Sequence, residues 1–149
     1  MSKKTVARNK KALHDYHIVD TYEAGVVLAG PEVKSIRAGK VSLTEAYARI
    51  DGNEAWLYGL HISPYDPASL WNVDPTRNRK LLLHRREIRR LIGATQQEGF
   101  TLVPLELYLK DGMVKVGLAL ARGKKLFDKR DDMKKRDAER EMQRAVRRV

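Results

Sequence analysis

Two Asp-Gly turns constrain the fold of this 149-residue chain more than any other feature. They are Asp51-Gly52-Asn53-Glu54 and Asp111-Gly112. Glycine after aspartate readily adopts the positive φ that a tight hairpin turn requires. Each turn lies between two β-prone segments, residues 47–50 and 55–60 for the first turn and residues 101–110 and 114–121 for the second. We therefore predict two β-hairpins.

The remaining patterns indicate one more strand and two short helices. Tyr16 to Ala29 is β-prone but is interrupted by Gly25, which predicts a strand with a turn or bulge at that glycine. Pro31 to Ala38 begins with proline and is followed by Gly39, which is the pattern of a short helix. His84 to Glu98 carries apolar residues at i, i+3 and i+4 and predicts an amphipathic helix.

These elements favour one small barrel. Ser63 to Arg79 is rich in Pro, Asp, Asn and Ser, has no apolar period, and is predicted to be a mobile loop. Four or five short strands, two hairpins and two or three short helices suit a partly closed antiparallel barrel of the oligonucleotide-binding (OB) type better than a βαβ sheet. The expected fold is mainly β, with an OB-like barrel.

The charge is uneven along the chain. In the whole sequence 30 Lys and Arg exceed 19 Asp and Glu, and the resulting net charge of +11 is typical of a nucleic-acid-binding protein. Residues 122–149 contain 12 basic and 6 acidic residues, so they contribute +6 of this charge. We therefore expect two units, a barrel domain over residues 1–121 and a basic C-terminal tail over residues 122–149.

The tail is rich in helix formers but poor in apolar surface. From Phe127 onward it has neither Gly nor Pro. Ala138, Met142, Ala145 and Val149 form only a thin apolar stripe, which is too small to offset an ordering entropy of about 1 to 2 kcal/mol per residue. We expect a tail that is disordered when free and helical on RNA, where its cations release counterions. The alternative is a solvated helix packed on the domain.

Several classes of function lack the residues they need. Cysteine is absent, which excludes thiolate metal sites and fits a reducing cytosol. His14 and His17 lack further ligands nearby, so neither a metal nor another cofactor is expected. No apolar run approaches the roughly 18 residues of a membrane span. We expect no enzyme, because the sequence offers no Walker loop, G-x-S-x-G elbow or paired carboxylates.

A basic cluster interleaved with leucines precedes the second predicted helix. Such a segment can pair with phosphates while an apolar side chain packs on an unstacked base. The alternative, with leucines in the core and arginines in solvent, fits the pattern equally well. The cluster consists of Arg77, Arg79, Lys80, His84, Arg85 and Arg86 around Leu81, Leu82 and Leu83.

Several longer runs form an ordered series over nearly the whole chain. They are Asn9-Lys10-Lys11-Ala12, His14-Asp15-Tyr16, Thr21-Tyr22-Glu23-Ala24-Gly25, Glu32-Val33-Lys34-Ser35-Ile36-Arg37-Ala38-Gly39-Lys40, Asp74-Pro75-Thr76-Arg77, Arg79-Lys80-Leu81-Leu82-Leu83, and Gly123-Lys124-Lys125 with Asp128-Lys129-Arg130. This series resembles the small protein B (SmpB) family. The resemblance implies the bacterial partner of transfer-messenger RNA (tmRNA) in trans-translation, the rescue of ribosomes stalled on messages without a stop codon.

The resemblance further implies that the barrel grips the tRNA-like domain of tmRNA. Glu23, Leu82 and His84 match the RNA-contacting surface of the family. Glu23 is expected to accept hydrogen bonds from base edges or 2′-hydroxyls, Leu82 to pack on a base, and His84 to stack or donate. The other expected tmRNA-binding residues, by position and charge, are Lys34, Arg37, Lys40, Arg79 and Lys80.

The tail resembles the family segment that enters the decoding centre of the small ribosomal subunit and lies as a helix along the empty mRNA channel. Phe127 is expected to stack on a decoding-centre nucleotide. The other expected ribosome contacts are Gly123, Lys124, Lys125, Asp128, Lys129, Arg130, Lys134, Arg136, Arg140 and Arg144. The sequence departs from the family pattern at His17, where Phe is more usual, and beyond Arg136.

The partners implied by the resemblance are tmRNA, the ribosome and, indirectly through alanyl-tmRNA, elongation factor Tu with GTP. The implied location is the bacterial cytoplasm, partly on the ribosome. A ribosomal or ribosome-assembly RNA-binding protein is the alternative, which explains the charge but not the ordered series of runs. A small RNA-modifying enzyme would need a catalytic pair or a metal site.

Overall fold

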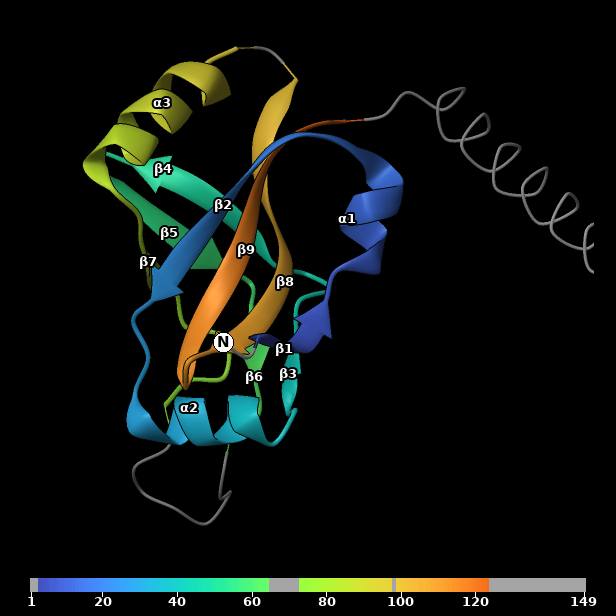
Figure 1. Ribbon diagram of the computed structural model, residues 1–149, viewed down its shortest axis with the longest axis vertical. Coiled ribbons are helices and arrows are strands. Elements are labelled where there is room, and N and C mark those ends of the chain that lie inside the picture. Colours follow the sequence, from blue (N-terminus) through green and yellow to red (C-terminus); the bar gives the residue numbers. More distant parts are fainter. Residues whose placement is uncertain (1–2, 65–72, 98, 124–149) are drawn as a thin grey trace, which may run out of the picture.

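The computed structural model describes residues 3–64, 73–97 and 99–123, which form nine strands and three helices. Figure 1 shows the long strands wrapped around one another, with α2 across one end of them and α3 and α1 on opposite sides. In chain order the elements are β1 (Lys3–Arg8), α1 (Lys10–Asp15), β2 (Tyr16–Val26), α2 (Gly30–Arg37), β3 (Val41–Ser42), β4 (Tyr47–Asp51), β5 (Glu54–Tyr58), β6 (His61–Ile62), β7 (Arg79–Leu82), α3 (Arg85–Thr95), β8 (Phe100–Lys110) and β9 (Met113–Gly123).

The main sheet is antiparallel and closes on itself. Its strand order is β1-β8-β4-β5-β7-β2-β9, and β9 pairs again with β8. Six strands therefore form a closed ring, to which β1 adds along β8. This confirms the predicted mainly β fold with a small antiparallel barrel, and the ring is more complete than the partly closed barrel we expected. Two joints are narrow, because β4 pairs with β8 at one residue and β2 pairs with β7 at two.

Both predicted hairpins are present, and the glycine of each turn has a positive φ. In the first hairpin only Gly52 has a positive φ, +63°, and Asp51 pairs with Glu54. In the second hairpin Asp111 and Gly112 both have a positive φ, +51° and +79°, as a type I′ turn requires. Two-residue turns leave no freedom in register, so they determine which side chains of β4, β5, β8 and β9 face inward.

The core fills the ring, and each of the longer helices adds one fully buried apolar residue to it. Ile36 of α2 and Leu91 of α3 are fully buried, and α3 buries no other side chain to that degree. Alternate residues of the strands point inward, as expected for sheets with one dry face. The fully buried strand residues include Ala24, Leu57, Leu81, Leu107, Val116 and Leu118.

The predicted bulge at Gly25 is wrong in position. The register of β2 against β9 shifts between Ile18 and Asp20, whereas Gly25 is regularly paired on both sides, with Lys115 of β9 and Leu82 of β7. Gly25 instead allows a close approach, because a Cβ added there would lie 3.3 Å from the Cβ of Leu82. The strand also ends at Val26 instead of Ala29.

Sequence patterns missed the N-terminal elements and the short strands β3, β6 and β7. The basic start of the chain carries no clear apolar alternation, yet β1 pairs with β8 and Asn9 caps α1. The amide of Asn9 accepts from the backbone of Ala12 and donates to the carbonyl of Pro104. The second predicted helix is present but ends at Thr95, before Glu98. The predicted mobility of the loop after Ser63 concerns mainly residues 65–72, outside the described residues.

A buried ion pair joins α2 to the start of β7. The side chains of Glu32 and Arg79 are 2% and 0% exposed, and Nε of Arg79 donates to Oε2 of Glu32 at 2.7 Å. The other guanidinium nitrogens of Arg79 donate to the carbonyls of Leu60 (2.7 Å) and Pro75 (3.1 Å). Arg77 also donates to Glu32. Each polar atom of the pair is therefore occupied inside the protein, which is the condition for burying charge.

The hydrogen bonds to Glu32 decide its charge state. Burial alone would raise the pKa of this carboxyl, but hydrogen bonds from Arg77, the backbone of Ala29 and Arg79 hold it below its ordinary value. Burial lowers the pKa of Arg79, against the opposing effect of Glu32. An arginine retains its proton under such a shift, so the pair is ionic at neutral pH.

We predict that Arg79→Leu lowers the free energy of unfolding by about 3–5 kcal/mol, because it leaves a buried carboxylate without its fully buried partner. Urea unfolding at pH 7 measures this change. Lys80→Ala is the matched control, since Lys80 pairs with Glu54 on the surface with both side chains more than 40% exposed, and its loss costs at most about 1 kcal/mol. Equal losses in the two variants would contradict the structural role of Arg79.

Candidate nucleic-acid interface

A groove opens on the outer face of the barrel where β9, β2 and β7 run side by side. Gly25 lies between Lys115 and Leu82 in this three-strand row. Because glycine has no side chain, the row has a depression at its centre that its two neighbours border. The groove has a volume of about 520 Å³, and its lining includes Glu23, Leu82, His84, Glu87, Met113 and Lys115.

Glu23 forms one wall of the groove, and two side chains of β8 contact its carboxylate. The hydroxyl of Tyr108 donates to Oε2 of Glu23 at 2.6 Å, and Nζ of Lys110 lies 3.3 Å from both carboxylate oxygens. Gly117 is opposite Glu23 in β9, and a Cβ added to it would lie 2.9 Å from the side chain of Glu106. The hydrogen bond from Tyr108, reinforced by Lys110, lowers the pKa of Glu23. The groove thus presents an oriented acceptor that is ionised at neutral pH and still 40% exposed.

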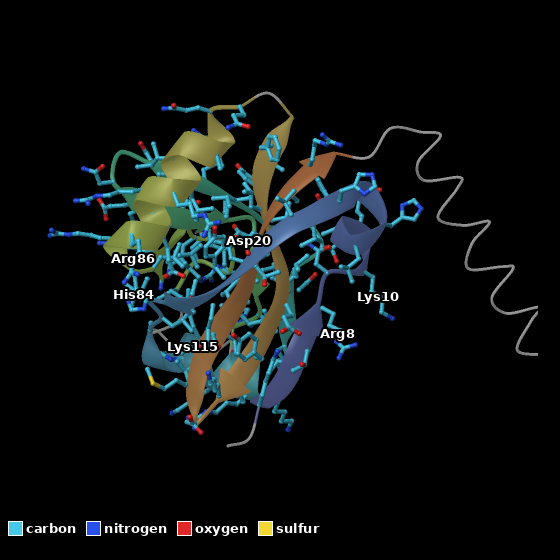
Figure 2. All side chains as sticks on the ribbon, turned by 45° about the horizontal axis from the view of Figure 1, so that its top comes forward. Arg8, Lys10, Asp20, His84, Arg86 and Lys115 are labelled. Atoms are coloured by element: carbon cyan, nitrogen blue, oxygen red, sulfur yellow. The ribbon has the colours of Figure 1, made fainter. Side chains whose placement is uncertain are left out.

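Leu82 and His84 form the opposite wall. Strand alternation buries Leu81 in the core and turns Leu82 outward, where it is 52% exposed. His84 caps α3 through its backbone, whose N–H donates to Glu87 at 3.0 Å, so the exposed imidazole takes no part in the cap. Figure 2 shows His84 and Lys115 near one another on this side of the molecule. Leu81 therefore has the core position of one interpretation, and Leu82 has the surface position of the other, whose contact with a base stays a prediction.

The basic residues of α2 lie at one end of the groove or away from it. A guanidinium nitrogen of Arg37 donates to the carbonyl of Gly112 at 3.2 Å, at the tip of the β8–β9 hairpin that lines the groove. Lys34 and Lys40 are exposed at α2 and just after it, but they are not among the lining residues. Arg37 is not among the lining residues either, but it is the one of the three cations that is shown bonded to a lining residue.

Two residues expected at this surface are placed elsewhere. Arg79 is fully buried against Glu32, so the prediction that it contacts RNA directly is corrected here, because its guanidinium has no exposed atom to offer. Lys80 points outward from β7 but on the side of β5, where it pairs with Glu54 at 2.7 Å. It borders the groove region without lining it.

The described residues contain no group of three or more His, Cys, Asp or Glu side chains placed to hold a metal ion. His14 contacts Asp15 at 3.0 Å. None of the helices in residues 3–64, 73–97 and 99–123 is long and apolar enough to cross a membrane.

Comparison with known proteins identifies the family. The model of the SmpB protein family matches residues 6–148. The chain belongs to the SmpB family. An SsrA-binding protein of Acetivibrio thermocellus is 60% identical over 144 residues, which cover 97% of this chain and 94% of that protein. One of Geobacillus sp. strain WCH70 is 58% identical over 144 residues, covering 97% and 93%.

A solved structure extends the likeness to three dimensions. It is described as "tmRNA-SmpB: a journey to the center of the bacterial ribosome", and its matching chain is 55% identical with a TM-score of 0.67. The match covers 80% of this chain and 84% of that one. The family resemblance inferred from the ordered runs is therefore confirmed, and the family assignment agrees with the expectation of a protein that is not an enzyme.

The expected ribosome contacts fall almost entirely outside the described residues. Gly123 is the exception, because it is the last residue of β9 and pairs with Tyr16. Arg122 also belongs to this strand, opposite His17, so the strand runs two residues past Ala121. The others, which stay predictions, are Lys124, Lys125, Phe127, Asp128, Lys129, Arg130, Lys134, Arg136, Arg140 and Arg144.

Sequence reasoning missed four residues that shape the groove: Gly25 as its floor, Lys115 as its cationic wall, and Tyr108 and Lys110 behind Glu23. The sequence does contain a signal that could have placed Lys115, Tyr108 and Lys110. The Asp111-Gly112 turn fixes the register of the hairpin, so Lys110 is opposite Met113 and Tyr108 is opposite Lys115. Counting alternation outward from that turn places Tyr108 and Lys115 on one face.

We predict that Tyr108→Phe raises the pKa of Glu23 toward its ordinary value, because the mutation removes the hydroxyl that chiefly stabilises the carboxylate. NMR titration of the Glu23 carboxyl measures the shift. Tyr22→Phe is the matched control, since it removes a phenol hydroxyl that donates to Asp20 instead. An unchanged Glu23 pKa in Tyr108→Phe would mean that Lys110 alone fixes its charge.

Proposed function

We propose that this protein binds the tRNA-like domain of tmRNA through the groove and carries it to ribosomes stalled on truncated messages. The observation that carries the proposal is the convergence of Glu23, Leu82 and His84. These residues come from distant parts of the sequence and line one groove. The relatives named SsrA-binding proteins and the solved tmRNA-SmpB structure support the same function. The family therefore favours this function over that of a ribosome-assembly protein.

The chemistry of the groove suits a folded RNA with exposed bases. The carboxylate of Glu23 accepts hydrogen bonds from base amino groups or 2′-hydroxyls, which a cation cannot do. Leu82 offers an apolar surface to the face of an unstacked base. Lys115, Arg37 and His84 surround these two groups and can meet phosphates, which supply affinity without sequence information.

The tail is the second half of the proposal. Residues 124–149 engage the decoding centre and the empty mRNA channel of the small subunit in the vacant A site, with Phe127 stacking on a nucleotide and the basic residues meeting ribosomal RNA phosphates. Elongation factor Tu with GTP joins through the alanyl end of tmRNA and needs no contact with this chain. The whole cycle takes place in the bacterial cytoplasm, partly on the ribosome.

We predict that Leu82→Ala weakens binding of the tRNA-like domain about 10-fold or more, because losing most of a buried leucine contact costs about 1.5 kcal/mol. Fluorescence anisotropy with a labelled tRNA-like domain at fixed salt measures the affinity. Leu13→Ala is the matched control, since Leu13 is 51% exposed against 52% for Leu82, belongs to α1 and is not among the residues that line the groove. A loss confined to Leu13→Ala would refute the groove as the binding site.

We also predict that a chain ending at Gly123 keeps its affinity for the tRNA-like domain within about 3-fold. The barrel and groove remain complete in it, because β9 ends there. The same variant should lose peptide tagging in a reconstituted translation system with messages lacking a stop codon. Loss of tmRNA affinity on truncation would show that the tail and not the groove provides the main contact.

A further inference from the structure

A second outward face of the barrel carries an aromatic stripe that the groove does not use. In β4 and β5 the small and aliphatic residues Ala48, Ala55 and Leu57 point into the core. The residues between them point outward by strand alternation. They are Tyr47, Arg49, Trp56 and Tyr58, which we call the aromatic stripe.

The members of the stripe are arranged as a stack. Tyr47 and Tyr58 are opposite one another in the hairpin, and their rings stack with centroids 5.2 Å apart and planes 14° apart. The guanidinium carbon of Arg49 lies 5.6 Å from the centre of the Tyr58 ring. Tyr47 nevertheless remains 46% exposed. A preformed stack with an accessible outer ring is the surface on which single-stranded nucleic acids place their bases.

Cations surround the stripe on the side of β7 and α3. Trp56 is opposite Lys80 of β7 on one side and opposite Arg49 of β4 on the other. At the turn end of the hairpin, Asn53 and α3 enclose a hollow of about 440 Å³ lined also by Arg85, Ile88 and Arg89. Figure 1 shows α3 beside this end of β4. The acids of the hairpin on this face are Asp51 and Glu54, and Glu54 is already paired with Lys80. Asp15 and Glu45 line a separate hollow beside Tyr47 together with Lys11, so the positive charge is concentrated toward β7 and α3.

The stripe is continuous with the groove. Lys80 and Leu82 point to the same outer side of β7, two residues and roughly 7 Å apart. Leu82 lines the groove, and Lys80 borders the stripe. An RNA strand leaving the groove over β7 therefore reaches the stripe within about one nucleotide spacing, with cations on both sides.

We infer that the aromatic stripe binds an unpaired stretch of the same RNA whose folded domain occupies the groove. One base stacks on the exposed face of Tyr47, and the phosphates of the strand meet Arg49, Arg85 and Arg89. The inference rests on the proposed function in one respect, because that function identifies the RNA as tmRNA. It adds a second contact, which reads single-stranded character through stacking and charge without sequence preference.

The test compares three RNA probes on the full-length chain: the isolated tRNA-like domain, full-length tmRNA and a twelve-nucleotide oligouridylate. Tyr47→Ala should weaken oligouridylate and full-length tmRNA binding about 5- to 150-fold, the equivalent of about 1–3 kcal/mol for one stacked base. Binding of the isolated tRNA-like domain should stay unchanged. Tyr47→Phe keeps the ring and should retain wild-type affinity for all three probes.

Arg49→Gln gives an independent readout that leaves the tyrosine stack in place. It should lower oligouridylate affinity and make it less dependent on salt, because one phosphate contact is lost. In a Trp71→Phe background Trp56 is the single tryptophan, and its fluorescence should be quenched by saturating oligouridylate.

Unchanged affinity for oligouridylate and tmRNA in both Tyr47→Ala and Arg49→Gln overturns the inference. A second result also overturns it: the wild-type chain self-associates in sedimentation experiments, and Tyr47→Ala abolishes this. A second copy of the chain would then cover the stripe. Failure of the proposed function is a different result, since it appears as unchanged binding of the tRNA-like domain in Leu82→Ala.

Discussion

The short strand β7 joins β5 to β2 and lies between the two outer surfaces of the barrel. The buried ion pair between Glu32 and Arg79 fixes its position. Three of the four residues of β7 pair with β5 on one side, and two pair with β2 on the other. The joint to β2 has only two residue pairs, so backbone hydrogen bonding alone gives it little support. Arg79 compensates by binding Glu32 of α2 and the carbonyls of Leu60 and Pro75. The position of Leu82 at the groove therefore depends on Arg79, a charged residue in the interior of the protein.

A strongly basic protein gains affinity for any RNA, so selectivity must come from groups that are not cations. Glu23 is such a group, because a fixed carboxylate repels phosphate and accepts only from donors on bases and riboses. Tyr108 and Lys110 keep it charged and oriented from behind. Under the proposed function, Gly25 and Leu82 add a depression and an apolar wall for a base, and the surrounding cations raise the affinity for an RNA that fits them.

The sequence predicted those features that local chemistry decides. Both Asp-Gly hairpins, the helix that begins near Pro31 and the helix after His84 were predictable from turn residues and periodicity. The ordered runs identified the family. The burial of Arg79 was not predictable, because nothing in a basic cluster distinguishes a buried arginine from an exposed one. Its partner Glu32 lies 47 residues away. The N-terminal strand was missed for a similar reason, since its pairing with β8 and not its own pattern makes it a strand.

The alternation within β7 explains why this segment tolerates so little change. Arg79 and Leu81 face the core while Lys80 and Leu82 face outward. A slip of one residue would expose every inward side chain and bury every outward one. It would turn Lys80 inward and take Arg79 away from Glu32, which would leave the buried carboxylate with only Arg77 and the backbone of Ala29 as partners. The ion pair therefore contributes less as a source of stability than as a determinant of register. That register puts Leu82 in the groove and Lys80 beside the aromatic stripe.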